Sequence, residues 1–269
     1  MILSSGSLGG WPVALALVAL VAYALAALPG SLLGRWAAPM LIAGVAAHAA
    51  MLAVEIGSTG LAPASARLGF GPVLSLTVCL VLLVHTIESR FLPLPSVRRI
   101  LACAGGAAVA LAVAYPGDPQ VLSSPLAPLH WLVGVASYGL FGAAVLHALL
   151  LDAAERRLRQ RVGAPGGAFG IPLLQLERLT FRFVQAGFIV LSAAIVLGIA
   201  TSTQWRWNHK TVLSLLGWAV FGALLAGRHW RGWRGQQATR WLYAGAVLLL
   251  LAYAGSRFVL EVVLGRVGI

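Results

Sequence analysis

Eight apolar runs, each about as long as a bilayer-crossing helix, constrain this chain more than any other feature of its sequence. A helix needs about 20 mostly apolar residues to cross the hydrocarbon core. Because backbone polar groups in lipid must be satisfied within the segment, such runs predict helices rather than open strands. The sequence therefore predicts an all-α membrane bundle of eight transmembrane helices, forming a single integral membrane domain over residues 1–269. The predicted spans are Trp11–Pro29, Trp36–Gly57, Phe70–Glu88, Val97–Tyr115, Ala127–Leu151, Leu179–Thr201, Thr211–Gly227 and Trp241–Val263.

Charge content separates this chain from soluble proteins. Charged residues make up only 10% of it, against roughly 25% in soluble domains, so they could not cover a water-exposed surface. The net charge of +12 would suggest a nucleic-acid partner in a soluble protein. Here the basic residues lie in the connections between apolar runs, so membrane topology explains them and no nucleic-acid partner is expected.

The distribution of Lys and Arg predicts the orientation, because cytoplasmic loops carry an excess of both. With the N-terminus outside, 14 of the 19 basic residues fall on the cytoplasmic side. We therefore expect both termini to be extracytoplasmic. The cytoplasmic set is Arg35, Arg90, Arg98, Arg99, Arg156, Arg157, Arg159, Arg161, Arg178, Arg182, Arg228, Arg231, Arg234 and Arg240.

The longest connection, Asp152–Arg178, predicts a charged helical extension followed by a turn rich in Gly and Pro. The two cysteines, Cys79 and Cys103, lie inside apolar runs and give no zinc-ligand spacing. No C-x-x-C-H motif occurs, which excludes covalent c-type haem attachment to this chain. No hydrolytic or nucleotide-binding signature occurs either, so the sequence does not predict an enzyme.

All six histidines lie in or beside predicted spans, and ionisable groups there are functional candidates because burying them in lipid is costly. The topology places His130 and His209 at the outer surface and His48 near the middle of its span. It places His85 and His147 near the inner surface, and His229 beyond it.

The outer segment Thr201–Lys210 has a composition that suits haem. Imidazole is a good axial ligand for iron, aromatic side chains can flank the porphyrin, and cations can bind its propionates. This segment supplies all three, and Arg257 near the outer end of the last span adds another cation. Each of these residues also has a simpler structural interpretation. A lone His often bonds between helices, an interfacial Trp often belongs to an aromatic belt, and Arg257 can pair with Glu261. The haem platform and propionate candidates are Trp205, Trp207, Arg206, Lys210 and Arg257.

Two stretches carry a family resemblance. The first is L-H-W-L-V-G-V-A-S-Y-G-L-F at Leu129–Phe141, followed by L-H-A-L-L-L at Leu146–Leu151. The second begins with W-R-W-N-H-K-T-V-L-S at Trp205–Ser214 and continues through G-R-H-W-R-G-W-R-G to L-A-Y-A-G-S-R-F-V at Leu251–Val259. Together they resemble the cytochrome c assembly protein family, the haem-handling membrane proteins of the CcsA/CcmC/CcmF type, and especially its short YpjD/HemX-like branch. The C-terminal half, 125–265, carries most of the resemblance.

The resemblance implies roles for particular residues. It assigns Trp205 and Trp207 to an external haem platform, and it makes His130 the first external iron ligand. Asn208-His209-Lys210 stands where larger family members have Asp-Pro-Lys, and no histidine follows the last span. We therefore expect His209 to be the second axial ligand, with His48 as a further candidate. A further hypothesis rests on predicted depth and not on a sequence match: His85 and His147 could form a separate inner site, as an intramembrane histidine pair does in the larger family members.

The leading hypothesis is a haem-binding, multi-pass protein of the bacterial inner membrane, with non-covalent haem b. It would act in haem delivery, cytochrome c maturation or haem homeostasis, together with other maturation or haem biosynthesis proteins. One alternative is a transporter, or transport accessory, for a small solute or metal ion, with His48 lining the path. Another is a ligand-free membrane scaffold or regulator that works through the basic loop Asp152–Arg182.

Overall fold

The computed structural model describes residues 10–57, 65–67, 69–90, 95–117, 119–121, 126–160, 172–201, 207–256 and 258–259. Within these residues, eight helices are long and apolar enough to cross a membrane, which confirms the predicted fold class. Contacts divide the chain into two units, and their described helices lie within residues 1–122 and 123–259. We call them the first and second helix groups and describe each by itself. The prediction of one membrane domain and of the orientation of the termini stays a prediction.

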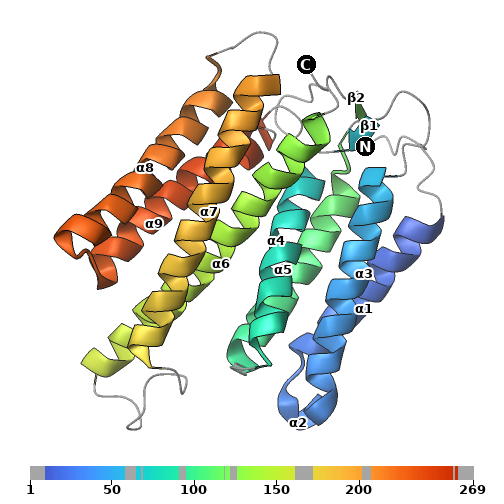
Figure 1. Ribbon diagram of the computed structural model, residues 1–269. Coiled ribbons are helices and arrows are strands. Elements are labelled where there is room, and N and C mark those ends of the chain that lie inside the picture. The colour runs from blue at the N-terminus through green and yellow to red at the C-terminus, as the bar shows by residue number, and fades with distance from the viewer. Residues whose placement is uncertain are drawn as a thin grey trace. The chain divides into compact units, whose positions relative to one another are not determined.

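The first helix group contains four long helices (Figure 1). Helix α1 packs against α3 and α5, and α4 packs against the same two helices. A two-stranded antiparallel sheet pairs Ser65 with Val121 and Arg67 with Pro119, a small addition to the predicted all-helical fold. The elements are α1 (Gly10–Ala27), α2 (Gly30–Leu33), the 3-10 turn η1 (Gly34–Trp36), α3 (Ala37–Gly57), β1 (Ser65–Arg67), α4 (Phe70–Glu88), α5 (Pro95–Ala114) and β2 (Pro119–Val121).

Small residues determine how closely these helices approach one another. The buried face of α1 carries alanines, which let neighbouring backbones come near, as is common in membrane bundles. Tyr23 is the large residue on that face and is fully buried. A Cβ at Gly44 or at Gly105 would lie 2.8 Å from the Tyr23 ring, so both positions need glycine for the ring to fit.

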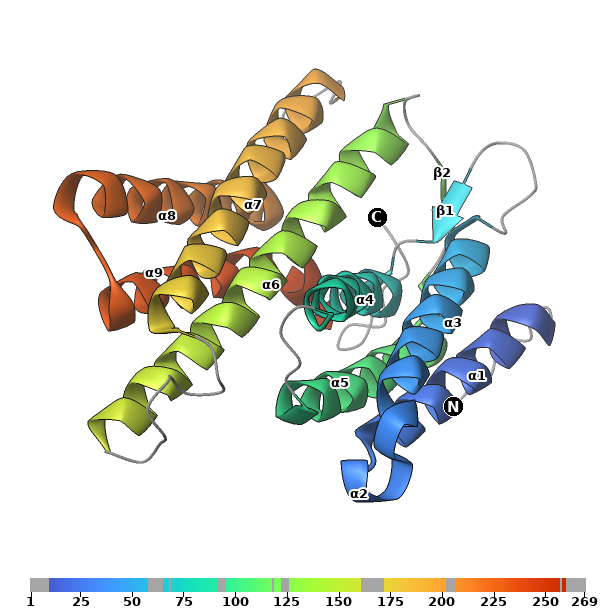
Figure 2. The same cartoon turned by 60° about the horizontal axis from the view of Figure 1, so that its bottom comes forward.

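The second helix group contains four long helices and a π-helical turn. Helix α6 packs against α7 and α9, and α8 packs against α7 and α9, which gives a four-helix arrangement (Figures 1 and 2). The elements are α6 (Ala127–Arg159), α7 (Leu173–Thr201), α8 (His209–Arg231), α9 (Gly235–Leu250) and the π-helical turn η3 (Leu251–Gly255).

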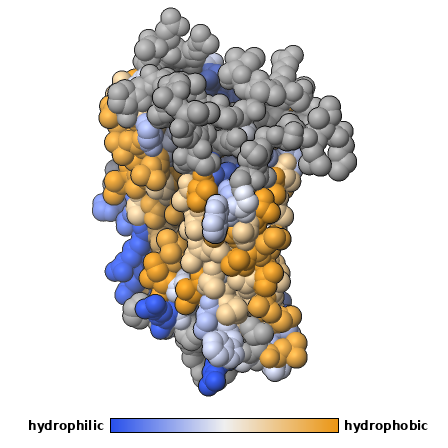
Figure 3. Space-filling view, turned by 90° about the vertical axis from the view of Figure 1, so that its right-hand side faces the viewer, coloured by the Kyte–Doolittle hydropathy of each residue, from blue (hydrophilic) through white to orange (hydrophobic). Residues whose placement is uncertain are grey.

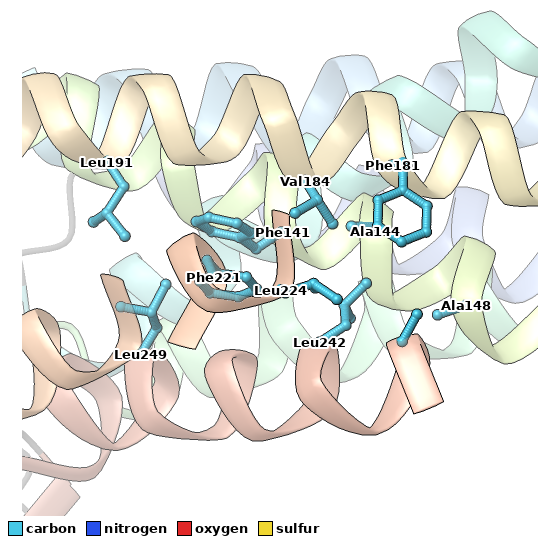
Figure 4. Packing of buried hydrophobic residues seen from close by; sticks show 11 residues of the cluster. Phe141, Ala144, Ala148, Phe181, Val184, Leu191, Phe221, Leu224, Leu242 and Leu249 are labelled. Atoms are coloured by element: carbon cyan, nitrogen blue, oxygen red, sulfur yellow. The ribbon is translucent and has the colours of Figure 1, made fainter. Parts of the chain in front are cut away.

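Two stacked aromatic rings lie within the core of this group. The rings of Phe141 and Phe221 stack with centroids 3.8 Å apart, and aliphatic side chains from all four helices surround them (Figure 4). A Cβ at Gly187 would lie 3.0 Å from Phe141, and one at Gly245 would lie 2.8 Å from Phe221. Glycine at these two positions therefore makes room for the stacked pair.

Two helices of the second group begin earlier than their apolar runs predict. Helix α7 begins at Leu173 rather than Leu179, and α9 begins at Gly235 rather than Trp241. Polar contacts explain the difference, because the buried carboxylate of Glu177 accepts a 2.6 Å hydrogen bond from Arg228 and lies 3.2 Å from Nε of Arg234. Hydropathy does not register such pairing, so it places the helix starts too late.

The first turns of α9 are held in a similar way by α6. Asp152 accepts hydrogen bonds from Thr239 Oγ1 at 3.0 Å and from the Tyr243 hydroxyl at 2.8 Å. The charged extension predicted after the fifth span is helical as expected, since α6 continues to Arg159. Three carboxyl-bearing side chains at this end, Asp152, Glu155 and Glu177, therefore all have partners within the group.

The surface of the protein matches a lipid environment. In Figure 3, hydrophobic side chains form a broad band, and hydrophilic side chains gather at its left edge and lower end. Large apolar residues are exposed on outward faces of the spans, among them Leu17, Val18 and Val21 of α1. An apolar surface of this extent would cause association in water, whereas lipid covers it without cost.

Candidate functional site

His130 lies in the first turn of α6, at the predicted outer end of the second helix group. Its ring is partly buried, and Nδ1 lies 2.9 Å from the backbone carbonyl oxygen of Ala194 in α7. A Cβ at Gly198, one turn further along α7, would lie 3.0 Å from Cε1 of His130. The absence of a side chain at Gly198 therefore allows the imidazole to lie against α7.

The hydrogen bond to Ala194 decides which nitrogen of His130 carries the proton. A carbonyl oxygen only accepts, so Nδ1–H is the donor, and in the neutral ring the lone pair is then on Nε2. No hydrogen bond from the described residues engages Nε2. Metal-binding histidines in proteins commonly have this arrangement, in which one ring nitrogen donates to a carbonyl while the other binds the metal.

The start of α8 is fixed by a side-chain cap. Oδ1 of Asn208 accepts hydrogen bonds from the backbone N–H and the hydroxyl of Thr211, both at 2.9 Å. Asn is among the preferred capping residues, so this cap sets where the helix begins. His209 and Lys210 consequently occupy the first turn and are exposed, and Trp207 precedes them with 72% of its surface exposed.

Lys210 connects α8 to the other helices at this end. Its ammonium nitrogen lies 4.8 Å from the ring centroid of Tyr253, within the range of a cation–π contact. The ring of Tyr253 in turn contacts Tyr138 of α6 edge-on, with centroids 6.5 Å apart. The described part of the site therefore combines an imidazole, an ammonium group and two phenol rings.

Tyr253 belongs to the π-helical turn η3, which was not predicted from the sequence. A π-turn widens the helix, and such turns are frequent at functional sites. The Ser256 hydroxyl lies 3.0 Å from the carbonyl oxygens of both Ala252 and Tyr253, which supports the widened turn. The run of small residues around Tyr253 is weak evidence by itself, because similar residues occur throughout the spans.

Open space adjoins His130 on the same face of α6. Gly134 lies one turn beyond it and Tyr138 lies two turns beyond it, and residues four apart share a helix face. A Cβ at Gly134 would meet no atom within 4 Å. A flat ligand that approaches His130 would therefore not meet a side chain at this point of α6.

His48, the central histidine of the first helix group, lies in a different environment. It is fully buried in α3, and both ring nitrogens have hydrogen-bond partners. Nδ1 lies 3.0 Å from the Tyr23 hydroxyl of α1, and Nε2 lies 2.7 Å from the Ser75 hydroxyl of α4. These contacts argue against His48 as an axial ligand, because neither nitrogen is available to a metal.

The predicted inner pair divides between the two groups. His85 is buried in α4 of the first group, and His147 is buried in α6 of the second. Nδ1 of His147 lies 2.8 Å from the Ala143 carbonyl oxygen, and its ring lies 5.1 Å from that of Phe183. An inner site formed by His85 and His147 together stays a prediction.

Three platform and propionate candidates, Trp205, Arg206 and Arg257, lie outside the described residues. Among the residues that the structure describes, no group of three or more His, Cys, Asp or Glu side chains is placed to hold a bare metal ion. Haem iron needs fewer protein ligands than a bare metal ion, because the protein supplies only its axial ligands.

Comparison with known proteins identifies the family. The sequence profile described as Cytochrome C assembly protein matches residues 3–264. The chain belongs to the cytochrome c assembly protein family. This confirms the resemblance inferred from its C-terminal half and extends it over nearly the whole chain.

Relatives place the chain more closely within this family. It is 30% identical over 263 residues to the inner membrane protein YpjD of Escherichia coli K12, which covers 92% of this chain and 98% of that protein. It is 30% identical over 86 residues to the cytochrome c biogenesis protein CcsA of Prochlorococcus marinus, covering 30% of this chain and 27% of CcsA. The YpjD match and the eight spans confirm the predicted branch and the localisation as a multi-pass inner membrane protein.

Proposed function

We propose that this family member binds haem b non-covalently at the outer end of the second helix group, with Nε2 of His130 as an axial ligand. The observation that carries the proposal is the hydrogen bond from Nδ1–H of His130 to the Ala194 carbonyl oxygen. This bond orients the ring, fixes its tautomer and makes Nε2 a better electron donor. Gly198 supports the same orientation by leaving space for the ring.

The surrounding residues fit the other parts of the haem molecule. Lys210 is proposed to supply a cation for a propionate, and its contact with Tyr253, whose ring also contacts Tyr138 of α6, supports this role. Trp207 supplies an exposed aromatic surface. Trp205, Arg206 and Arg257 are proposed to complete the platform and the propionate contacts.

His209 is the proposed second axial ligand. It is exposed in the first turn of α8, next to Lys210, so its ring is accessible to a ligand at the outer surface. The capping bond that Oδ1 of Asn208 accepts from the Thr211 N–H holds this turn in place without using the imidazole. A His130–His209 pair would give low-spin iron, and bound haem would supply a visible spectrum and one-electron redox chemistry.

The proposed role is haem handling in cytochrome c maturation, haem delivery or haem homeostasis. Membership of the family supports it, as does the likeness to a protein named for cytochrome c biogenesis. The residues at the site bind and orient a ligand, and we propose no catalytic step for them. The proposed partners are haem, the lipid bilayer and other maturation or haem biosynthesis proteins.

An absorption spectrum of the full-length protein in detergent, before and after addition of haemin, tests this proposal. We expect a Soret band with bis-histidine features, lost in His130→Ala and weakened in His209→Ala. His229→Ala is the matched control, because His229 is exposed at the opposite end of α8. A colourless protein that takes up no added haemin would contradict the proposal and favour a ligand-free scaffold.

The transporter alternative receives less support. It depended on His48 lining a path across the membrane, but this residue is fully buried between Tyr23 and Ser75. Solute uptake into proteoliposomes that is lost in His48→Ala, with a folded protein, would restore that alternative.

A further inference from the structure

An outward stripe of α7 joins two arginines to a long apolar surface. Exposed residues recur along it at intervals of three or four, the spacing of one helix face. The predicted cytoplasmic end carries Arg178, Arg182 and Gln185, and the rest is apolar. The complete stripe is Arg178, Arg182, Gln185, Ile189, Ala193 and Val196.

The length of α7 places these residues relative to the membrane. Thr201 ends the helix on the predicted outer side. With a rise of about 1.5 Å per residue, Arg182 lies roughly 28 Å from Thr201, which is close to the thickness of the hydrocarbon core. The two arginines are therefore at headgroup level, and Gln185 lies roughly 4 to 5 Å deeper, where the ester groups of lipids begin.

The polar groups of this stripe have no partners among the residues that the structure describes. Other arginines at the same end do have them, since Arg228 and Arg234 bind Glu177 and Arg159 contacts Glu155. Asp152 is engaged by Thr239 and Tyr243. Because an amide that faces lipid without a hydrogen bond is costly, we expect Gln185 to bind a polar partner that is not among the described residues.

We propose that this stripe is a binding site for one anionic glycerophospholipid. Arg178 and Arg182 bind the phosphate, because guanidinium groups match phosphate oxygens in charge and geometry. Gln185 donates to an ester carbonyl below the phosphate, and an acyl chain lies along Ile189, Ala193 and Val196. The general excess of Arg on cytoplasmic sides explains the charge, but it does not explain an amide one turn deeper on the same face.

A lipid fits this stripe better than an acidic soluble partner does. Such a partner could reach Arg178 and Arg182, but it would not reach Gln185 or the apolar residues beyond it. A polar transmembrane helix is the other candidate occupant, because amides also bond between helices in lipid. The two occupants predict different results when the lipid composition is changed.

Native mass spectrometry of the full-length protein tests the proposal. The protein is released from nanodiscs containing equal amounts of phosphatidylglycerol and phosphatidylcholine. We expect one phosphatidylglycerol to stay bound in preference to phosphatidylcholine. Arg178→Gln combined with Arg182→Gln should lower its retention about tenfold, because charge-assisted hydrogen bonds are lost. Gln185→Leu should lower it by a smaller factor.

The matched control is Arg159→Gln combined with Arg231→Gln. It removes the same charge from the same end of the protein but leaves the α7 stripe intact. A loss of lipid in the control equal to that in the Arg178/Arg182 variant would overturn the proposal in favour of general electrostatic attraction. Equal retention of the two lipids, or retention unchanged in all variants, would also overturn it and favour a helix as the occupant. Release of the lipid by excess inorganic phosphate would overturn the lipid assignment and show that the arginines form only an anion site.

Discussion

His48 in the first helix group and His130 in the second show how one residue type takes two roles in one protein. Both nitrogens of His48 bond to side chains from two other helices, so the ring joins α1, α3 and α4. His130 uses one nitrogen on a backbone carbonyl and keeps a lone pair on the other. The number of engaged nitrogens, rather than depth in the membrane, therefore separates a structural histidine from a candidate ligand.

The largest effect should come from His130→Ala, which removes the proposed axial ligand. We expect haem affinity to fall about 100-fold or more, since changes that touch only a metal ligand's hydrogen-bond partners already cost about 10- to 100-fold. Haemin titration followed at the Soret band measures it. His48→Ala, assayed in protein that remains folded, should bind haemin normally. The reverse pattern would remove the distinction between the two histidines.

The same His48→Ala variant should lower stability instead. It leaves the Tyr23 and Ser75 hydroxyls buried without their partner and creates a cavity, so we expect a loss of about 2 to 4 kcal/mol. Thermal unfolding in detergent, compared with His130→Ala, provides the measurement. An unchanged unfolding temperature for His48→Ala would show that the buried bonds contribute little.

Substitutions at Gly44 in the first helix group and at Gly134 in the second should differ in their effect on stability. Gly44→Ala should cost about 1 to 3 kcal/mol, because the added methyl group would overlap the Tyr23 ring. Gly134→Ala should leave stability almost unchanged, since open space surrounds that position. Unfolding temperatures of the two variants test this, and equal effects would contradict the predicted difference in local packing.

The side-chain cap of α8 should contribute less to the free energy of unfolding. Asn208→Ala removes the acceptor for the Thr211 N–H, so we expect a loss of about 1 kcal/mol. Asn208→Asp keeps an acceptor at this position and is the matched control. Hydrogen exchange at the first turn of α8 reports the effect directly, and equal exchange in both variants would exclude a capping role.

Lys210→Gln should have the smallest effect, because it removes an exposed cation while leaving the proposed ligands in place. We expect haem affinity to fall about threefold, which is typical of a single exposed charge contact. The difference should shrink at high salt, since screening weakens such contacts. An equal loss at low and high salt would argue against a charge contact with a propionate.

The fold could be predicted from the sequence to a large extent, because each span is encoded in its own residues. The span Phe70–Glu88 agrees with α4, since a continuous apolar run sets both of its ends. The starts of α7 and α9 were placed too late, because Glu177 and Asp152 extend these helices through contacts with residues far away in the sequence. Hydropathy measures transfer of residues into lipid and contains no information on such partners.

The candidate site was predictable in part. The sequence placed His130, Lys210 and Trp207 at the same end, because alternating spans assign a side to each residue. It gave no indication of the contact with Ala194 or of the π-turn that carries Tyr253. It also left His48 as a candidate ligand, since the partners Tyr23 and Ser75 come from other spans.

The sequence by itself determined that the chain crosses the membrane eight times and that it resembles a haem-handling family. Apolar length and local motifs are properties of contiguous residues, and they are readable before the chain folds. Only the tertiary structure decided which histidine nitrogens are engaged and which remain open to a metal. That decision depends on hydrogen bonds between helices, as for His48 with Tyr23 and Ser75 and for His130 with Ala194. Such bonds depend on which helix faces meet, and helix packing alone establishes this.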